Sequence, residues 1–144
     1  MTLDEIQAEW EKDSEIDRTE LGQESIKIPQ LHSKYYKMFS KERLILRKLE
    51  ADYKILKFAK HEFYTQGPNE ETQAKGWKFP NIGQILKSDL NTYMEADKDI
   101  IEISLRIGYQ QEKVDMLESA IKSLVARGFN LKAAIEWEKF KVGA

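Results

Sequence analysis

Residues 34–61 read KYYKMFSKERLILRKLEADYKILKFAKH, and this stretch decides the fold class of the chain. It holds nine lysines and arginines against three acidic residues, a balance of 9 − 3 = +6. Apolar residues recur through it at three- and four-residue intervals, which is the period of one face of an α-helix. The stretch therefore predicts a long amphipathic helix that carries its positive charge away from the core.

The predicted helix runs over residues 30–65 and has two distinct sides. At about 100° per residue, its apolar side consists of Leu31, Tyr35, Met38, Ile45, Leu49, Tyr53, Leu56 and Phe63. The opposite side gathers Tyr36, Arg43, Arg47, Lys54, Lys57 and His61. Such a basic helical face is typical of proteins that bind a polyanion, and nucleic acid phosphate is the polyanion we expect.

Net charge conceals this pattern, because the whole chain of 144 residues carries a formal charge of −2. Residues 1–25 hold nine acidic residues against Lys12 and Arg18, a balance of 2 − 9 = −7. Charges further apart than about 8–10 Å are screened at physiological salt, so a ligand meets the local field and not the average. The basic helix can therefore attract an anion although the protein as a whole is slightly acidic.

The remaining sequence predicts further helices and an all-α, elongated, oligomeric architecture. A short helix is expected from Thr2 or Asp4 to Lys12, and a loop over residues 66–81 contains Gly67 and Pro68. A second long helix is expected over residues 82–127, with Gly128 ending it. We thus predict a helical domain over residues 1–128, built on a hairpin of two long helices, and a separate C-terminal helix over residues 129–144.

The C-terminal helix is predicted to be the oligomerisation element. A helix of this length is marginally stable alone. In isolated helices shorter than about 12–15 residues, too few hydrogen bonds form to offset the free-energy cost of nucleation. Its apolar side must therefore dock, and a neighbouring subunit is a natural partner for Leu131, Ile135, Trp137 and Phe140. In the second long helix, Asp97, Ser104 and Gln111 interrupt the apolar stripe at seven-residue steps. They either set register in a helical seam or face solvent.

Catalytic and metal-binding chemistry is not expected. The sequence has no cysteine, and its two histidines, His32 and His61, lie far apart without a second ligand at helical spacing. No glycine-rich phosphate loop and no nucleophilic triad is recognisable. We interpret the acidic residues 89–102 as a solvated helix flank. The chain is predicted to be no enzyme, to need no cofactor or metal, and to be soluble and cytoplasmic, since neither a signal peptide nor a membrane span is apparent.

Scattered residues along nearly the whole chain give it a resemblance to a known family. They include Lys12-Asp13, Ile16-Asp17, Ser33-Lys34, Glu50-Ala51, Ala96-Asp97-Lys98-Asp99, Arg127-Gly128-Phe129 and Phe140. With them the chain resembles the UvsY-type recombination mediators of T-even-type bacteriophages. The resemblance implies a helical homo-oligomer, a hexamer or heptamer ring, that binds single-stranded DNA. It also implies loading of a RecA-like phage recombinase onto strands covered by single-stranded-DNA-binding protein, in the cytoplasm of the infected host.

The same resemblance implies that DNA is contacted by a Lys-Ala-Arg tripeptide on the long basic helix. The collinear residues here are Phe58-Ala59-Lys60, with Lys57 just before them. Together with the helical count, this gives the predicted DNA-binding residues Lys57, Lys60, Arg43, Arg47, Lys54, His61 and Tyr36. The helical count also puts Lys60 near the apolar side. Trp77, Tyr35, Tyr64 and Phe58 are further candidates for stacking on bases, although most of them are expected in the core.

A second function remains open from the residues alone. A basic helix is often simply a solvated face, so the chain could equally be a non-enzymatic oligomeric scaffold whose basic face binds an acidic protein partner. Binding of single strands that weakens steeply with salt separates the mediator from the scaffold.

Overall fold

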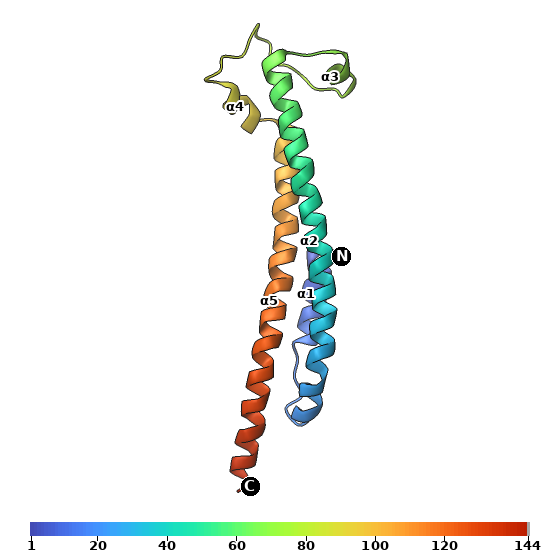
Figure 1. Cartoon of the computed structure of the whole chain (residues 1–144), viewed down its shortest axis with the longest axis vertical. Helices are drawn as coiled ribbons and strands as arrows, with labels where there is room; N and C mark the ends of the chain where they lie inside the picture. The colour runs from blue at the N-terminus through green and yellow to red at the C-terminus, as the bar shows by residue number, and fades with distance from the viewer. Residues whose placement is uncertain (144) are drawn as a thin grey trace. The chain divides into compact units, whose positions relative to one another are not determined.

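The computed structural model describes residues 1–143, and in this range the chain is helical without strands. Its elements are α1 (Leu3–Asp13), α2 (Leu21–Gln66), α3 (Glu70–Ala74), α4 (Leu90–Glu95) and α5 (Lys98–Lys141), as labelled in Figure 1. The predicted all-α class is thereby confirmed. The chain divides into two compact units, of which unit 1 comprises Met1–Ile45 with Gln110–Ala144 and unit 2 comprises Leu46–Tyr109.

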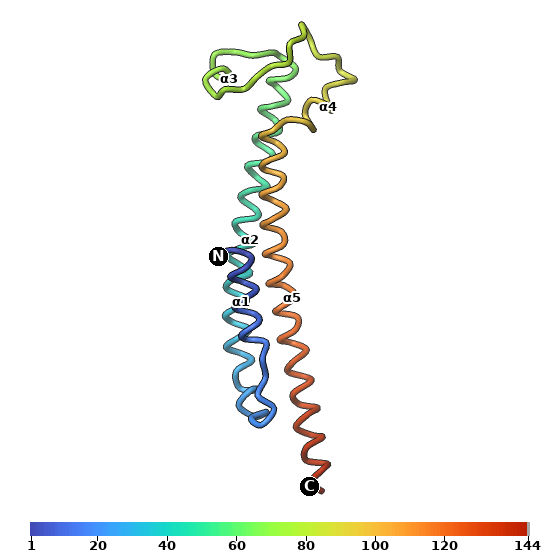
Figure 2. Tube along the Cα trace, turned by 180° about the vertical axis from the view of Figure 1, so that it is seen from behind, coloured from blue at the N-terminus to red at the C-terminus, as the bar shows by residue number. Residues whose placement is uncertain are grey.

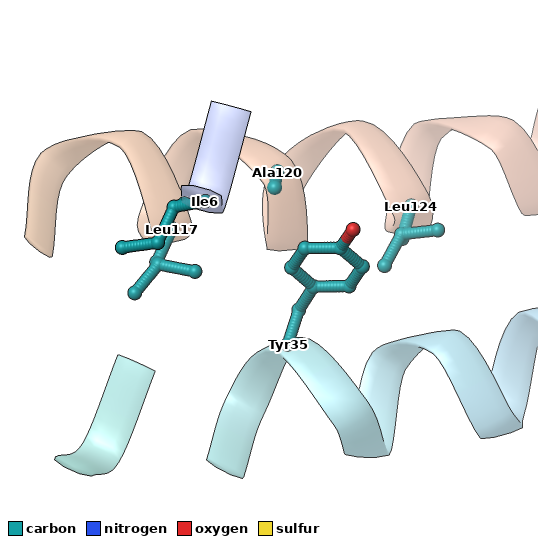
Figure 3. Close-up of a cluster of buried hydrophobic side chains, with 5 residues drawn as sticks. All are labelled: Ile6, Tyr35, Leu117, Ala120 and Leu124. Atoms are coloured by element: carbon teal, nitrogen blue, oxygen red, sulfur yellow. The ribbon is translucent and has the colours of Figure 1, made fainter. Parts of the chain in front are cut away.

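Unit 1 packs three helical segments side by side: α1, the first part of α2 and the larger part of α5 (Figures 1 and 2). Its core contains Ile6 from α1, Tyr35 from α2, and Leu117, Ala120 and Leu124 from α5. Figure 3 shows the Tyr35 ring reaching from α2 towards the apolar residues of α5. With the partly buried residues Trp10, Leu31 and Met38, the core residues of each helix lie three, four or seven positions apart, so each helix presents one apolar side to the others.

Polar contacts fix α1 in unit 1. The helix begins with a capping box, in which Thr2 Oγ1 accepts from the Glu5 N–H at 3.1 Å and Glu5 Oε2 accepts from the Thr2 N–H at 3.0 Å. At its end, Asp13 accepts hydrogen bonds from Tyr35 at 2.8 Å and from Lys34 at 2.6 Å. Arg127 donates to the carbonyl oxygens of Asp13 and Ser14, both at 3.1 Å, which satisfies carbonyls that α1 leaves without helical partners.

Unit 2 holds the rest of α2, the start of α5, and the segment 67–97 that contains α3 and α4. Its core consists of Phe63, Tyr64, Met94 and Ile100, against which Trp77 and Phe79 pack. The rings of Trp77 and Phe79 meet Phe63 edge to face, with centroids 5.5 and 5.6 Å apart. Aromatic residues from the predicted loop thus cover the end of α2.

The first long helix begins earlier than predicted. It starts at Leu21, so Pro29 lies inside α2 and not at its start. Proline at this position removes one N–H donor, whose partner would be the carbonyl of Ser25, while the turns on either side keep their hydrogen bonds. Before the helix, Asp17 accepts from the N–H and the hydroxyl of Thr19, which forms a turn.

The second long helix differs from its prediction at both ends. Residues 81–89 are not helical, and α4 is separated from α5 by Ala96 and Asp97. Accordingly Leu86, which lies inside the predicted helix range, is 66% exposed. The predicted end at Gly128 is wrong, because α5 continues through this residue to Lys141. Gly128 does not adopt the positive φ that a helix-terminating glycine needs, whereas Gly67 does, directly after α2. No helix boundary therefore separates residues 129–141 from the rest of α5.

Replacing Gly128 by alanine is expected to raise the free energy of unfolding by about 0.5–1 kcal/mol, because glycine is disfavoured inside a helix by that amount. Apart from its chain neighbours and the backbone of its own helix, a Cβ atom at this position meets no atom within 4 Å. Urea denaturation followed by circular dichroism, at one fixed protein concentration, measures the change.

Gly67→Ala is the control for this prediction, because the φ of +88° at Gly67 is unfavourable for any residue with a side chain. It should lower stability where Gly128→Ala raises it. A loss of stability in Gly128→Ala would show that Gly128 does end a helix in the folded protein.

Candidate nucleic-acid interface

In unit 2, the basic side of α2 is exposed and its charges are unpaired. Arg47, Lys54, Lys57 and His61 are all exposed. Among residues 1–143 none of the four has an ion-pair partner; the structure pairs Lys48 with Asp52 and Lys60 with Asp97 and Asp99 instead. Positive charges without carboxylate neighbours can exchange their counterions for phosphates, which is the basis of salt-dependent nucleic acid binding.

In unit 1, α2 carries the predicted site residues Tyr36 and Arg43. Tyr36 is 50% exposed and stacks on His32, with centroids 6.3 Å apart and an angle of 12° between the rings. Arg43 is half-buried, with its guanidinium 5.0 Å from the centre of the Phe39 ring. Its Nε has no hydrogen-bond partner in the described chain. Both residues therefore lie on the accessible side of α2, with Arg43 partly held against an aromatic ring.

Lys60 lies in a different environment from the other predicted DNA contacts. It is 3% exposed, and its ammonium contacts Asp97 at 3.1 Å and Asp99 at 2.8 Å. The same ammonium lies 3.9 Å from the centre of the Trp77 ring. Placement near the apolar side agrees with the helical count. A phosphate that approached Lys60 would have to displace two carboxylates, so Lys60 is not part of the exposed basic face.

Asp97 is the centre of this buried network. One of its oxygens accepts from the N–H groups of Asp99 and Ile100, at 3.0 and 3.1 Å, which caps the first turn of α5. The other accepts from the Tyr64 hydroxyl at 2.6 Å and contacts Lys60. Burial alone would raise the pKa of Asp97, but the hydrogen bonds from Tyr64, Ile100 and Lys60 outweigh burial and lower it. Burial and the bond to Asp97 raise the pKa of the Tyr64 hydroxyl, so this group stays a proton donor.

Neither interpretation of the seven-residue polar series describes all three residues. Asp97 is buried and bonded as described, whereas Ser104 is exposed and Gln111, half-buried, donates to Asp115 at 2.8 Å on the same helix. The three residues therefore share no seam within the chain. Sequence reasoning had also placed Asp97 on a solvated flank. That interpretation is wrong for Asp97, because it could not foresee that Lys60 and Tyr64 reach this carboxylate from α2.

Most aromatic candidates for stacking belong to the core. Tyr35 is fully buried and Tyr64 is 8% exposed. Trp77 is held between Phe63 and the ammonium groups of Lys60 and Lys75, the latter 4.9 Å from the ring centre. Phe58 is different, since 65% of it is exposed on α2.

The sequence pattern missed an apolar component on the outward side of α2. Leu44 is 60% exposed in unit 1, and Ile55 is 69% exposed in unit 2. Neither residue belongs to the predicted apolar stripe, and at about 100° per residue Ile55 falls within about 60° of Phe58. A helical count of all apolar residues, including those outside the stripe, would have shown this.

The predicted oligomerisation residues divide into two groups. Leu131 is 4% exposed and belongs to the packing of unit 1, and Ile135 is half-buried. Trp137 and Phe140 are 58% and 72% exposed, and their rings stack on each other with centroids 5.5 Å apart. Trp137 and Phe140 thus form an exposed aromatic surface on the last turns of α5.

Residues 1–143 contain no cluster of three or more histidine, cysteine, aspartate or glutamate residues placed to hold a metal ion. None of the helices in this range combines the length and the apolar character that a membrane span requires.

Replacing Lys60 by methionine is expected to cost about 3 kcal/mol in the free energy of unfolding, because it leaves the Asp97 carboxylate buried without its counter-charge. Lys57→Met removes an exposed, unpaired charge from the same turn of α2 and should change stability by less than about 0.5 kcal/mol. Urea denaturation of both variants at equal protein concentration measures the difference. Equal stabilities would mean that Lys60 does not hold Asp97 in solution.

Comparison with known proteins gives these residues a context. The model of a family described as "Recombination, repair and ssDNA binding protein UvsY" matches residues 9–144. The recombination protein UvsY of Enterobacteria phage T4 is 26% identical over 144 residues, which cover 99% of either chain. A crystal structure of the bacteriophage T4 recombination mediator protein UvsY, lattice type II, matches with a TM-score of 0.85 at 25% identity, over 99% of this chain and 98% of that one. Lattice type IV of that protein matches with a TM-score of 0.81 at 23% identity, over 98% and 99% of the two chains.

Proposed function

Because this chain belongs to the UvsY family of recombination, repair and single-stranded-DNA-binding proteins, we propose that it is a recombination mediator that binds single strands through the exposed basic side of α2. The family is one of binding proteins, and we propose no catalytic role for the chain. Its place of action in this proposal is the cytoplasm of a phage-infected host cell.

The observation that carries the proposal is the distribution of ion pairs. Of the nine lysines and arginines in residues 34–61, Lys34, Lys48 and Lys60 have carboxylate partners, while the others have none among residues 1–143. In unit 2 the unpaired charges are Arg47, Lys54 and Lys57, and His61 follows one turn later. A scaffold that bound an acidic protein could use the same charges, but family membership favours DNA.

Lys60 has a supporting role in this proposal. Lys60 is collinear with the arginine of the Lys-Ala-Arg tripeptide that the resemblance implies, yet its ammonium already has two carboxylate partners. By holding Asp97 it stabilises the first turn of α5 and the end of α2 within unit 2. Arg47, Lys54, Lys57 and His61 then make the phosphate contacts of unit 2, and Arg43 and Tyr36 those of unit 1.

The proposal includes a homo-oligomer, a ring of six or seven copies, that multiplies weak contacts. Each protomer adds a basic face, and linked sites bind a single strand far more tightly than one site does. We propose that this avidity draws the strand away from the protein that covers it and presents it to a RecA-like recombinase. Trp137 and Phe140 are the exposed aromatic residues proposed to bind the neighbouring protomer.

The triple variant Arg47→Ala, Lys54→Ala, Lys57→Ala is expected to bind a labelled oligothymidine much more weakly than the unmodified chain. The slope of log K against log salt should flatten by about 2 per bound protomer, because each single-strand phosphate contact contributes about 0.7. Fluorescence anisotropy over a series of salt concentrations measures both quantities. The variant should also stimulate less ATP hydrolysis by the recombinase on covered strands.

A charge-matched control removes three exposed lysines from α5, Lys122, Lys132 and Lys139, and should leave the slope unchanged. Unchanged affinity and slope in the α2 variant would place the DNA elsewhere. Failure of the unmodified chain to bind at low salt would leave the scaffold as its function.

The double variant Trp137→Ala, Phe140→Ala is expected to lower the mass of the particle in light scattering, because it removes the exposed aromatic surface of α5. Ile26→Ala, which removes a residue that is 67% exposed on α2, is the control and should keep the full mass. A double variant that keeps the full mass would mean that the assembly is held by other contacts.

A further inference from the structure

We propose that Phe58 stacks on an unpaired base, and that this contact makes the basic face of α2 selective for single strands. The inference rests on the proposed function and adds a base-binding site to it. It concerns a position at which the resemblance predicts a basic residue and this chain has an aromatic one.

Phe58 is the free aromatic ring on this part of α2. Residues 46–66 contain four aromatic side chains, of which Phe63 and Tyr64 are buried and Tyr53 is half-buried. Phe58 is 65% exposed, and no other ring packs against it in the described part of the chain. The water-exposed face of a phenyl ring is unfavourable, so a flat apolar ligand that covers it gains free energy.

The charges around this ring are those that a nucleic acid strand requires. Lys54 lies one turn before Phe58 and His61 one turn after it, about 6 and 4.5 Å along the helix axis. Arg47 falls within about 20° of the same direction three turns earlier, and Lys57 precedes Phe58 directly. All four are exposed, and none has an ion-pair partner among residues 1–143. A strand held by its phosphates on these groups brings its bases within reach of the ring.

Stacking requires the face of a base, and a duplex hides these faces within its own stack. A phosphate contact cannot tell the two forms apart by itself, whereas an aromatic platform favours the unpaired strand whatever its sequence. The alternative use of an exposed apolar residue is an interface between protomers. Such an interface would have to bury Lys54 and Arg47 beside Phe58, and in this chain they bring no carboxylates with them to offset the cost.

The test compares Phe58→Ala with Ile55→Ala, which shortens an equally exposed side chain one turn earlier on α2. Two short labelled oligonucleotides of equal length are used, an oligothymidine and one in which abasic residues replace the thymidines. Anisotropy titrations at several salt concentrations give the affinity and the salt slope, and light scattering gives the mass of each variant.

We expect Phe58→Ala to bind the oligothymidine roughly 5- to 150-fold more weakly, which is the range for a stacked base. Its affinity for the abasic strand, its salt slope and its mass should be unchanged, and Ile55→Ala should behave like the unmodified chain. Phe58→Trp, which keeps an aromatic ring at this position, should bind the oligothymidine more tightly than the abasic strand, as the unmodified chain does.

Three results would overturn the inference: equal affinity of Phe58→Ala and the unmodified chain for oligothymidine, equal losses on both strands, or a lower particle mass. The last would identify Phe58 as an interface residue. None of these results would affect the proposed function, which depends on the salt slope of the Arg47, Lys54 and Lys57 variant.

Discussion

The buried contact between Lys60 and Asp97 is the constraint on which unit 2 depends. A carboxylate taken out of water is costly unless charge and hydrogen bonds replace its hydration. Asp97 receives both, from the Lys60 ammonium at 3.1 Å, the Tyr64 hydroxyl at 2.6 Å and two N–H groups at the start of α5. The end of α2 and the first turn of α5 are therefore linked through Asp97, together with the contact between Lys60 and Asp99.

This contact also explains why some positive charges of α2 in unit 2 are paired with carboxylates and others are not. A lysine on the apolar side needs a carboxylate partner, and Lys60 has Asp97 and Asp99. Lysines and arginines on the outer side need none, because water solvates them, and Arg47, Lys54 and Lys57 have none among the described residues. The same residue type is thus structural on one side of the helix and available for phosphates on the other.

Unit 1 repeats the principle with different residues. Glu42 is 4% exposed and accepts from Gln110 at 2.6 Å and from Lys113 at 3.0 Å. Burial alone would raise the pKa of Glu42, but these bonds and charges lower it. Acidic residues, which composition alone would place on the surface, can therefore be buried and bonded between packed helices. In each unit the cost of burying them is offset by a donor from another helix.

The sequence by itself determined the helical class, the basic side of α2 and most of its apolar side, because side-chain period and charge depend on local geometry alone. Ile45 is the exception on the apolar side, since it is 43% exposed and its neighbour Leu46 is buried in its place. The sequence also narrowed the capped start of α1 to Thr2 or Asp4, and the structure has Thr2 as the cap. Only the tertiary structure decided that Lys60 is buried, that Asp97 caps α5 and that α5 continues through Gly128. The physical reason is that the partner groups come from distant parts of the sequence. Lys60 and Asp97 are separated in the sequence by residues 61–96. A local sequence pattern therefore cannot predict which carboxylate pairs with this lysine.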